Sequence, residues 1–297
     1  MNFVKNKCKF IIIPIVLIIA GIVMFCVNGG FNFDVEFSGG TRMQVKIGQE
    51  YKNDEIKSLI KEKNNVDAIV QKAGNGDAII KTPPIEEETK QAILNTLTEA
   101  YNLGEDALVS SRSAAPSFGK ETQAKALMYT LIALLCILAY IAIRFEWRSA
   151  VMAVLALAIN VLVMMAVYAI CYIPLNTTFI AAMLTVVGYS INNTIVIFDR
   201  IRENMKSVGK SSITEGVDRS IKESMGRTIN ATITTLITIV LLYIIGVEAI
   251  KEFALPLIIG IIAGAYSSIT MAAPFWATWK EAEKKAKAAK LQKGKKK

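Results

Sequence analysis

Residues 177–198 read TTFIAAMLTVVGYSINNTIVIF, an apolar run interrupted by a short polar group. A helix needs about 20 mostly apolar residues to cross the roughly 30 Å hydrocarbon core of a bilayer, and this run has that length. Ser190, Asn192, Asn193 and Thr194 lie in its second half, where buried polar groups are energetically unfavourable unless they serve packing or function. The run therefore predicts a membrane-spanning helix with a polar site inside it.

Five further apolar runs of similar length flank this one, in a chain of 297 residues with a hydrophobic fraction of 53% and a mean hydropathy of +0.41. The first follows three lysines but lacks a small-residue cleavage site, so we expect an uncleaved anchor. The sequence thus predicts a membrane-embedded all-α bundle of six helices. The runs are Phe10–Val27, Ala124–Ile143, Ala150–Ile173, Thr177–Phe198, Ile229–Val247 and Phe253–Trp276.

The placement of lysine and arginine predicts the orientation of these spans. Residues 1–9, 144–149, 199–228 and 280–297 carry net charges of +3, +1, +2 and +7, whereas residues 28–123 carry −4 and residues 248–252 carry −1. Positive loops face the cytoplasm. We therefore expect a multi-pass protein of the bacterial cytoplasmic membrane with both termini in the cytoplasm. Its predicted parts are residues 1–27 (first span), 28–123 (outer domain), 124–198 (spans two to four), 199–228 (inner loop), 229–276 (last two spans) and 277–297 (basic tail).

The outer segment, residues 28–123, is long enough to fold as a small domain. Its patterns predict strands and helices in the order strand, helix, two strands, helix, strand, which is typical of a ferredoxin-like α+β fold. Residues 34–37 and 42–47 alternate like strands, and Ser38-Gly39-Gly40-Thr41 between them indicates a turn or bulge, not a phosphate loop. The other elements expected are helices 53–63 and 85–101, a hairpin of residues 68–72 and 78–81, and a strand at 107–112.

The inner loop and the tail are basic without the interleaved aromatic residues of nucleic-acid binders. The inner loop, residues 199–228, has apolar residues at helical spacing, which favours interfacial helices lying on the membrane surface. The net charge of +9 is concentrated where the inside-positive rule places it. We therefore expect contacts with membrane lipids and none with nucleic acid.

The composition excludes several kinds of catalytic site. The chain has no histidine, and its four cysteines show no metal-binding or redox spacing. We expect no enzyme activity, no cofactor and no metal site.

Ser190, Asn193 and Thr194 share one face of the fourth predicted span, because residues three and four positions apart are neighbours on a helix. Such a face can serve function or hydrogen bonding between helices, and the spacing leaves both open. Arg227 opens the fifth span, where an arginine commonly extends to the aqueous surface. Asp199 and Arg200 follow the fourth span as part of a charge cluster typical of a topology signal.

Four segments together resemble the signature of the SecF family, which is related to SecD within the resistance-nodulation-division superfamily. They are FDVEFSGGT (33–41), VGYSINNT (187–194), FDRIREN (198–204) and GRT (226–228). Among these residues the family motif covers Asp34, Gly39, Gly40, Thr41, Gly188, Tyr189, Asp199 and Arg200. The likeness extends over nearly the whole chain.

The resemblance implies a role in protein export. Members of this family form a complex with SecD that uses the proton gradient to draw secreted chains through SecYEG after the ATPase SecA has pushed them. It implies SecD and SecYEG as partners, SecA as an indirect partner and the translocating preprotein as the substrate. An efflux transporter half of the same superfamily, or a membrane scaffold without transport activity, are the alternatives.

One position departs from the family pattern. Typical members have Asn-Asp where this chain has Asn192-Asn193, and the resemblance implies that this aspartate couples protons. Asn193 cannot titrate, while the family's neighbouring arginine is matched by Arg227. Two explanations stay open. The titrating carboxylate comes from SecD while Asn193 and Arg227 supply hydrogen bonds and charge, or Ser190, Asn193 and Thr194 help a partner carboxylate to bind sodium. The first is preferred, because neutral oxygens alone make a weak cation site.

Overall fold

The structure is a computed structural model that describes residues 2–72, 76–144, 146–207 and 212–294. The chain divides into two compact units. The helical unit comprises residues 1–31, 129–173 and 178–297, and the sheet-containing unit comprises residues 32–128 and 174–177. The second unit therefore includes the short connection between two membrane helices, which lies far from the rest of that unit in sequence.

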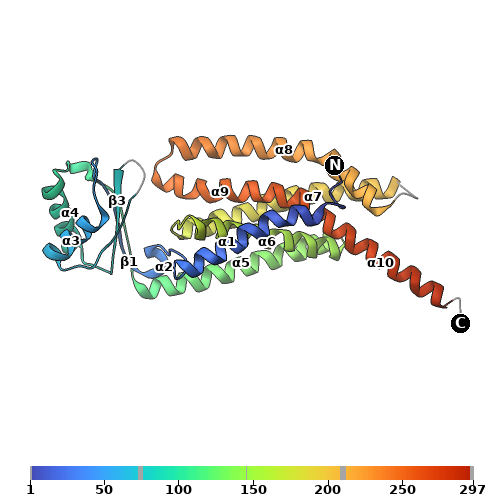
Figure 1. Cartoon of the computed structure of the whole chain (residues 1–297), viewed down its shortest axis with the longest axis horizontal. Helices are drawn as coiled ribbons and strands as arrows, with labels where there is room; N and C mark the ends of the chain where they lie inside the picture. Colours follow the sequence, from blue (N-terminus) through green and yellow to red (C-terminus); the bar gives the residue numbers. More distant parts are fainter. Residues whose placement is uncertain (1, 73–75, 145, 208–211, 295–297) are drawn as a thin grey trace. The chain divides into compact units, whose positions relative to one another are not determined.

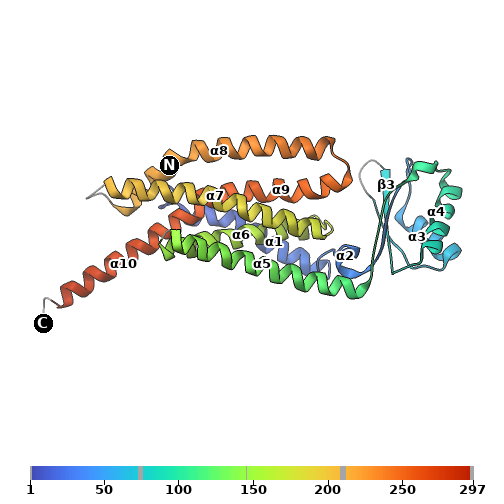
Figure 2. The same cartoon turned by 180° about the vertical axis from the view of Figure 1, so that it is seen from behind.

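Six helical segments of the described residues are long and apolar enough to cross a membrane, as the sequence predicted. Figures 1 and 2 show them side by side, with α8 at the edge of the bundle next to α9. The last span continues from α9 through one π-helical stretch, η3, into α10. The helices are α1 (Lys7–Val27), α5 (Pro116–Arg144), α6 (Trp147–Ile170), α7 (Thr177–Ser207), α8 (Ile213–Ile245), α9 (Glu248–Ser267), η3 (Ser268–Ala272) and α10 (Ala273–Gly294).

Glycines set the closest approaches between these helices. A Cβ at Gly21 of α1 would overlap Ala166 of α6, and a Cβ at Gly260 of α9 would overlap Val186 of α7 and Met164 of α6. Small residues let membrane helices pack backbone to backbone, where the van der Waals contact is greatest. The last of these contacts brings α6, α7 and α9 together around the predicted polar site.

The inner loop is not a pair of interfacial helices, so that prediction was wrong. Instead, α7 continues to Ser207, and α8 begins at Ile213 with the Ser212 hydroxyl accepting a hydrogen bond from the Glu215 N–H. The apolar side chains of this region, Ile201, Ile213, Val217 and Ile221, are buried in a core with Phe198. Their helical spacing reflects packing between two long helices, which the sequence pattern alone does not distinguish from packing on lipid.

The second unit contains a four-stranded antiparallel sheet in the order β2-β3-β1-β4. Its strands are β1 (Gly40–Lys46), β2 (Ile69–Lys72), β3 (Asp77–Thr82) and β4 (Leu108–Ala114). Helices α3 (Asn53–Asn64) and α4 (Glu87–Tyr101) lie on one face of the sheet in Figure 1, and the short helix η2 (Glu105–Ala107) precedes β4. Met43, Ile56, Ile80 and Leu97 are buried between the sheet and the helices. The predicted helices and hairpin strands are confirmed, and the hairpin turn, residues 73–75, lies outside the described residues.

The predicted strand at residues 34–37 was wrong. Val35–Ser38 forms one helical turn, α2, with Val35 and Phe37 buried. Alternating apolar residues in so short a segment fit a helical turn as well as a strand. Gly39 and Gly40 then have φ angles of +77° and +122°, and a Cβ at Gly40 would overlap the carbonyl oxygen of Thr82. The chain reversal into β1 therefore requires glycine.

Residues 32–36 bind the connection between α6 and α7. Phe33 and Leu175 form an isolated parallel bridge, in which the Leu175 N–H donates to the Asn32 carbonyl and the Asp34 N–H donates to the Leu175 carbonyl, both at 2.8 Å. We call residues 32–36 and 174–177 the clasp. The clasp ends at Thr177, the first residue of α7, so it fixes the start of the helix that bears the predicted polar site.

Candidate functional site

The polar residues predicted on the fourth span lie in a buried cluster shared by three helices. Ser190 on α7 accepts a hydrogen bond from the Asn160 amide of α6 at 3.0 Å. The Thr194 and Ser268 hydroxyls lie 2.9 Å apart, and Ser268 also donates to the Ser190 carbonyl at 3.2 Å. Ser267 donates to the Asn160 side-chain oxygen at 3.4 Å. These groups satisfy one another in a region where water is excluded.

The backbone of the last span is adapted to this cluster. A Cβ at Gly264 would overlap the Ser190 hydroxyl and would lie 2.9 Å from the Asn160 amide nitrogen, so a larger residue would displace both. One turn further, Ser268–Ala272 adopts π-helical geometry. Such wide turns inside α-helices are frequent at functional sites. Here the wide turn begins at Ser268, which bonds to α7, directly after Ser267, which bonds to α6.

Asn193 differs from its neighbours in the cluster. It is 4% exposed, yet its amide nitrogen has no hydrogen-bond acceptor among the described residues. The neighbouring Tyr189 hydroxyl is likewise buried without a partner there. A buried donor without an acceptor costs about 1–3 kcal/mol. The Ser190 and Thr194 hydroxyls are hydrogen-bonded to described residues, whereas the Asn193 amide nitrogen is not.

The structure does not bring Arg227 into this cluster. Arg227 is exposed on α8 and makes no hydrogen bond or ion pair with a described residue. It heads an exposed polar stripe formed with Asn230, Thr234 and Thr238, spaced three or four residues apart along α8. We call these four residues the α8 stripe. Asn192 and Gly188 are exposed on α7, whereas Ser190 and Asn193 are buried.

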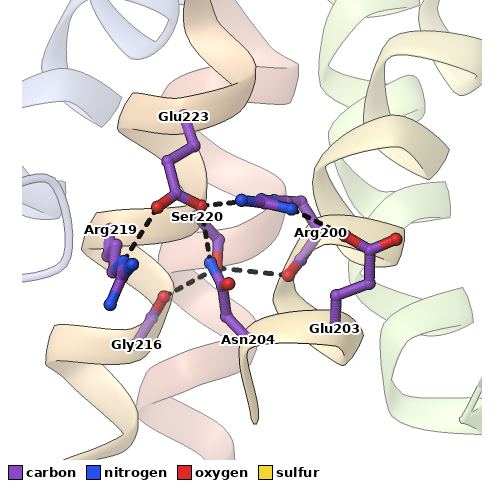
Figure 3. A network of polar contacts seen from close by, with 7 residues as sticks. All are labelled: Arg200, Glu203, Asn204, Gly216, Arg219, Ser220 and Glu223. Atoms are coloured by element: carbon purple, nitrogen blue, oxygen red, sulfur yellow. Dashed lines mark hydrogen bonds and ion pairs between the residues drawn. The ribbon is translucent and has the colours of Figure 1, made fainter. Parts of the chain in front are cut away.

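A second polar network joins the end of α7 to the start of α8 (Figure 3). The Glu223 carboxylate accepts hydrogen bonds from Arg200 at 2.7 Å, Asn204 at 2.8 Å and Arg219 at 2.8 Å. Arg200 also pairs with Glu203 at 2.8 Å. The hydrogen bond from Asn204 and those from the two arginines lower the pKa of Glu223 to about 2. Glu223 therefore stays ionised at physiological pH, and its ion pair with Arg200 joins the end of α7 to the start of α8.

Asp199 lies beside this network but has no bond to it among the described residues. Asn204 is the central member of the network, because it also donates to Ser220 at 2.9 Å, and Ser220 donates to the Gly216 carbonyl at 2.7 Å. The sequence pattern favoured a topology signal for Asp199 and Arg200. The structure gives Arg200 a direct bonding role as well.

Asp34 of the family motif lies fully buried beside β1 and β3. Its carboxylate is 3.6 Å from Arg42 and 3.7 Å from Lys81. Burial lowers the pKa of Lys81, and Asp34 opposes that shift. Thr41, next in the motif, lies 3.0 Å from the Ser113 hydroxyl across the β1–β4 pair. Two cations therefore flank this one buried carboxylate, which belongs to the clasp.

Two members of the cluster, Asn160 and Ser267, were not predicted from the sequence. Asn160 is a lone amide in the otherwise apolar third span, so the rule that drew attention to the fourth span would also have found it. Ser267 lies between Gly264 and Ser268, outside the four-residue spacing of Gly260, Gly264 and Ser268, so no sequence pattern marks it. Within the described residues no three His, Cys, Asp or Glu side chains are grouped as metal ligands would be.

Comparisons with known proteins agree with this arrangement. Residues 89–282 match the family described as protein export membrane protein SecD/SecF, C-terminal. The chain is 33% identical over 286 residues to protein translocase subunit SecF of Alicyclobacillus acidocaldarius, covering 94% of this chain and 92% of that protein. It is 34% identical to protein translocase subunit SecF of Petrotoga mobilis, covering 92% of this chain and 94% of that protein.

A solved structure extends the likeness to the fold. The crystal structure of SecDF, a translocon-associated membrane protein from Thermus thermophilus, superposes with a TM-score of 0.85 at 30% sequence identity. The match covers 95% of this chain and 39% of the SecDF chain. A chain with six candidate spans, a small antiparallel sheet and near full-length similarity to SecF subunits therefore belongs to the SecD/SecF family of protein-export membrane proteins.

Proposed function

We propose that this chain works with a SecD partner to draw exported proteins through SecYEG, after SecA has pushed them, with energy from the proton gradient. In this proposal both termini lie in the cytoplasm and the sheet-containing unit lies outside the cytoplasmic membrane. The charge distribution of the loops supports the orientation. The strand order β2-β3-β1-β4 with one helix after β1 and one after β3 supports a ferredoxin-like outer domain.

The observation that carries the proposal is the buried Asn193 amide without an acceptor, in a cluster that contains no carboxylate among its described members. A proton carrier inside the membrane needs a titratable group, and neither Asn160 nor Asn193 can titrate. We infer that the titrating carboxylate belongs to SecD. Asn193 supplies a hydrogen-bond donor toward it, and Arg227 supplies positive charge at the same interface.

Sodium binding by the cluster is the less favoured explanation. Sodium would need oxygen atoms that are free to face it. The Ser190 hydroxyl oxygen already accepts a hydrogen bond from Asn160, and the Thr194 and Ser268 hydroxyls are hydrogen-bonded to each other. Using them for sodium would break the bonds that hold α6, α7 and the last span together.

The exposed polar face of the bundle supports a partner within the membrane. The α8 stripe would face lipid in the isolated chain, which is unfavourable for an arginine and an asparagine. The neighbouring α7 presents Ala181, Thr185, Gly188 and Asn192 as a second exposed line of small or polar residues. SecD helices packed on these two lines would cover both.

The test is protein export into proteoliposomes that contain SecYEG, SecA, SecD and this chain. A proton gradient should stimulate export and a sodium gradient should not. Asn193→Asp should alter the dependence of export on pH, because it adds a titratable group beside the SecD carboxylate. Stimulation by sodium alone would contradict the proton proposal. Unchanged export without this chain, or drug efflux with it, would favour a scaffold or an efflux transporter.

A further inference from the structure

A cavity of about 500 Å³ opens at the end of the helical bundle where the apolar spans give way to charged residues. Its walls come from the end of α5, the start of α6, the end of the apolar part of α7 and the start of α10. None of the residues discussed above as the buried cluster lines it. A volume of this size is typical of small-molecule sites.

The cavity is strongly basic. Arg144, Arg202, Lys206 and Lys280 line it, and Glu146 is the one acidic residue among the described lining residues. The Glu146 carboxylate already pairs with Lys280 at 2.6 Å and with Arg148 at 3.1 Å. Arg202 and Lys206, one turn apart on α7, make no ion pair with any described residue. Two cations therefore face the cavity without a counter-ion from the described part of the chain.

The remaining wall is apolar and aromatic. Phe198, Ile201 and Trp276 line the cavity and are almost fully buried. The Trp276 indole N–H has no acceptor among the described residues, and Lys280 lies 5.0 Å from the centre of the Trp276 ring. Trp147 and Trp279 form an edge-to-face pair at the same end of the bundle, as aromatic residues commonly do at the level of lipid headgroups.

We propose that this cavity binds the headgroup of an anionic phospholipid. A phosphodiester supplies the negative charge for Arg202 and Lys206, and the adjoining acyl chains suit the apolar wall. The edge of a membrane-spanning bundle is where such a molecule is present at high local concentration. A zwitterionic lipid carries the same phosphate together with an ammonium group, which four basic residues repel.

The test is a titration of the purified full-length chain, in a neutral detergent, with dioleoylphosphatidylglycerol, monitored by native mass spectrometry. Dioleoylphosphatidylcholine, with the same acyl chains, tests the headgroup. Inorganic phosphate tests whether a free anion suffices. We expect retention of phosphatidylglycerol, at least tenfold weaker retention of phosphatidylcholine, and no displacement by inorganic phosphate. Equal retention of both lipids, or displacement by phosphate, would overturn the lipid site.

Matched variants locate the binding. The double variant Arg202→Gln/Lys206→Gln should weaken phosphatidylglycerol binding about 30-fold, because each basic residue near a membrane surface contributes about fivefold. Lys284→Gln/Lys285→Gln removes the same charge from exposed positions of α10 outside the cavity and should change binding less than threefold. The swap Arg202→Lys/Lys206→Arg keeps the charge and should retain binding. Equal losses in the two glutamine variants would show diffuse attraction instead of a site.

Discussion

The Glu36 carboxylate accepts hydrogen bonds from the backbone N–H of Thr177 at 2.9 Å and from its hydroxyl at 2.5 Å. Thr177 is the first residue of α7, where helical N–H groups lack partners within the helix and the helix dipole favours negative charge. Arg112 lies 3.4 Å from the other Glu36 oxygen and holds the carboxylate in place. A residue of the SecF motif region thus caps the helix that carries Ser190 and Asn193.

Removing this cap should loosen the first turn of α7. Glu36→Ala should lower the free energy of opening that turn by about 1 kcal/mol, the usual value of a helix cap, and hydrogen exchange of the amides of residues 177–180 measures it. Glu36→Gln keeps an acceptor oxygen and should lose less than the alanine variant. Unchanged exchange in the alanine variant would contradict the capping role.

Gly264→Ala should destabilise the helical bundle by about 1–3 kcal/mol, because the added methyl group overlaps the Ser190 hydroxyl in a packed interior. Gly188→Ala is the matched control, since Gly188 is exposed on α7 and its Cβ would meet no atom within 4 Å. That control should be neutral or stabilising by up to about 1 kcal/mol, because alanine favours helix. Thermal unfolding of both variants in detergent compares them, and equal melting temperatures would contradict the tight α7–α9 approach.

Asn160→Ala and Asn193→Ala should separate structural from functional roles. The first removes the donor to Ser190 and the acceptor of Ser267, so unfolding of the isolated chain should become easier by about 1–3 kcal/mol. The second removes a donor that has no acceptor in the described chain and should cost less stability, while export by the complex with SecD falls. If Asn193→Ala destabilises the isolated chain as much as Asn160→Ala does, Asn193 is a packing residue.

The Glu223 network should resist mild acid. The pKa of Glu223 is lowered to about 2, below the ordinary 4.5 of a glutamate, so its contribution to stability is complete above pH 4.5 and is lost as the pH falls from 4.5 through 2. Glu223→Gln should therefore melt below the parent protein at pH 7, and the difference should narrow between pH 4.5 and pH 2. The exposed Glu62→Gln, on α3, is a control for charge removal. A constant difference across this pH range would contradict the shift.

The membrane spans and the starts of helices α3 and α4 could be predicted because each pattern lies within one short stretch of sequence. An apolar run as long as Ala150–Ile173 is stable in a bilayer as a membrane-spanning helix. The glutamates after Pro84 indicate the start of α4 without reference to any other segment. Residues 34–37 could not be assigned locally, because so short a segment fits a helical turn as well as a strand, and the Asp34 N–H has its partner at Leu175. That partner is distant in sequence and has no recognisable pattern.

The candidate site was predicted on one helix and found on three. Ser190 and Thr194 were placed correctly on a shared face, since helical periodicity fixes which residues are neighbours. Which of the other helices faces them depends on packing, so only the structure shows that Asn160 and Ser267 lie beside them. Arg227 shows the converse limit. The family resemblance implied a place next to the cluster, whereas the structure leaves Arg227 exposed on α8.

The Phe33–Leu175 bridge also sets an order of events during synthesis. All four strands leave the ribosome before α5 and α6, whereas Leu175 follows both. The sheet can therefore form early, but Asp34 and Glu36 receive their partners at Leu175 and Thr177 only after α5 and α6 have been synthesised. In a nascent chain halted before Pro174, the four strands would be present while the Asp34 N–H and the Glu36 carboxylate still lacked their partners at Leu175 and Thr177.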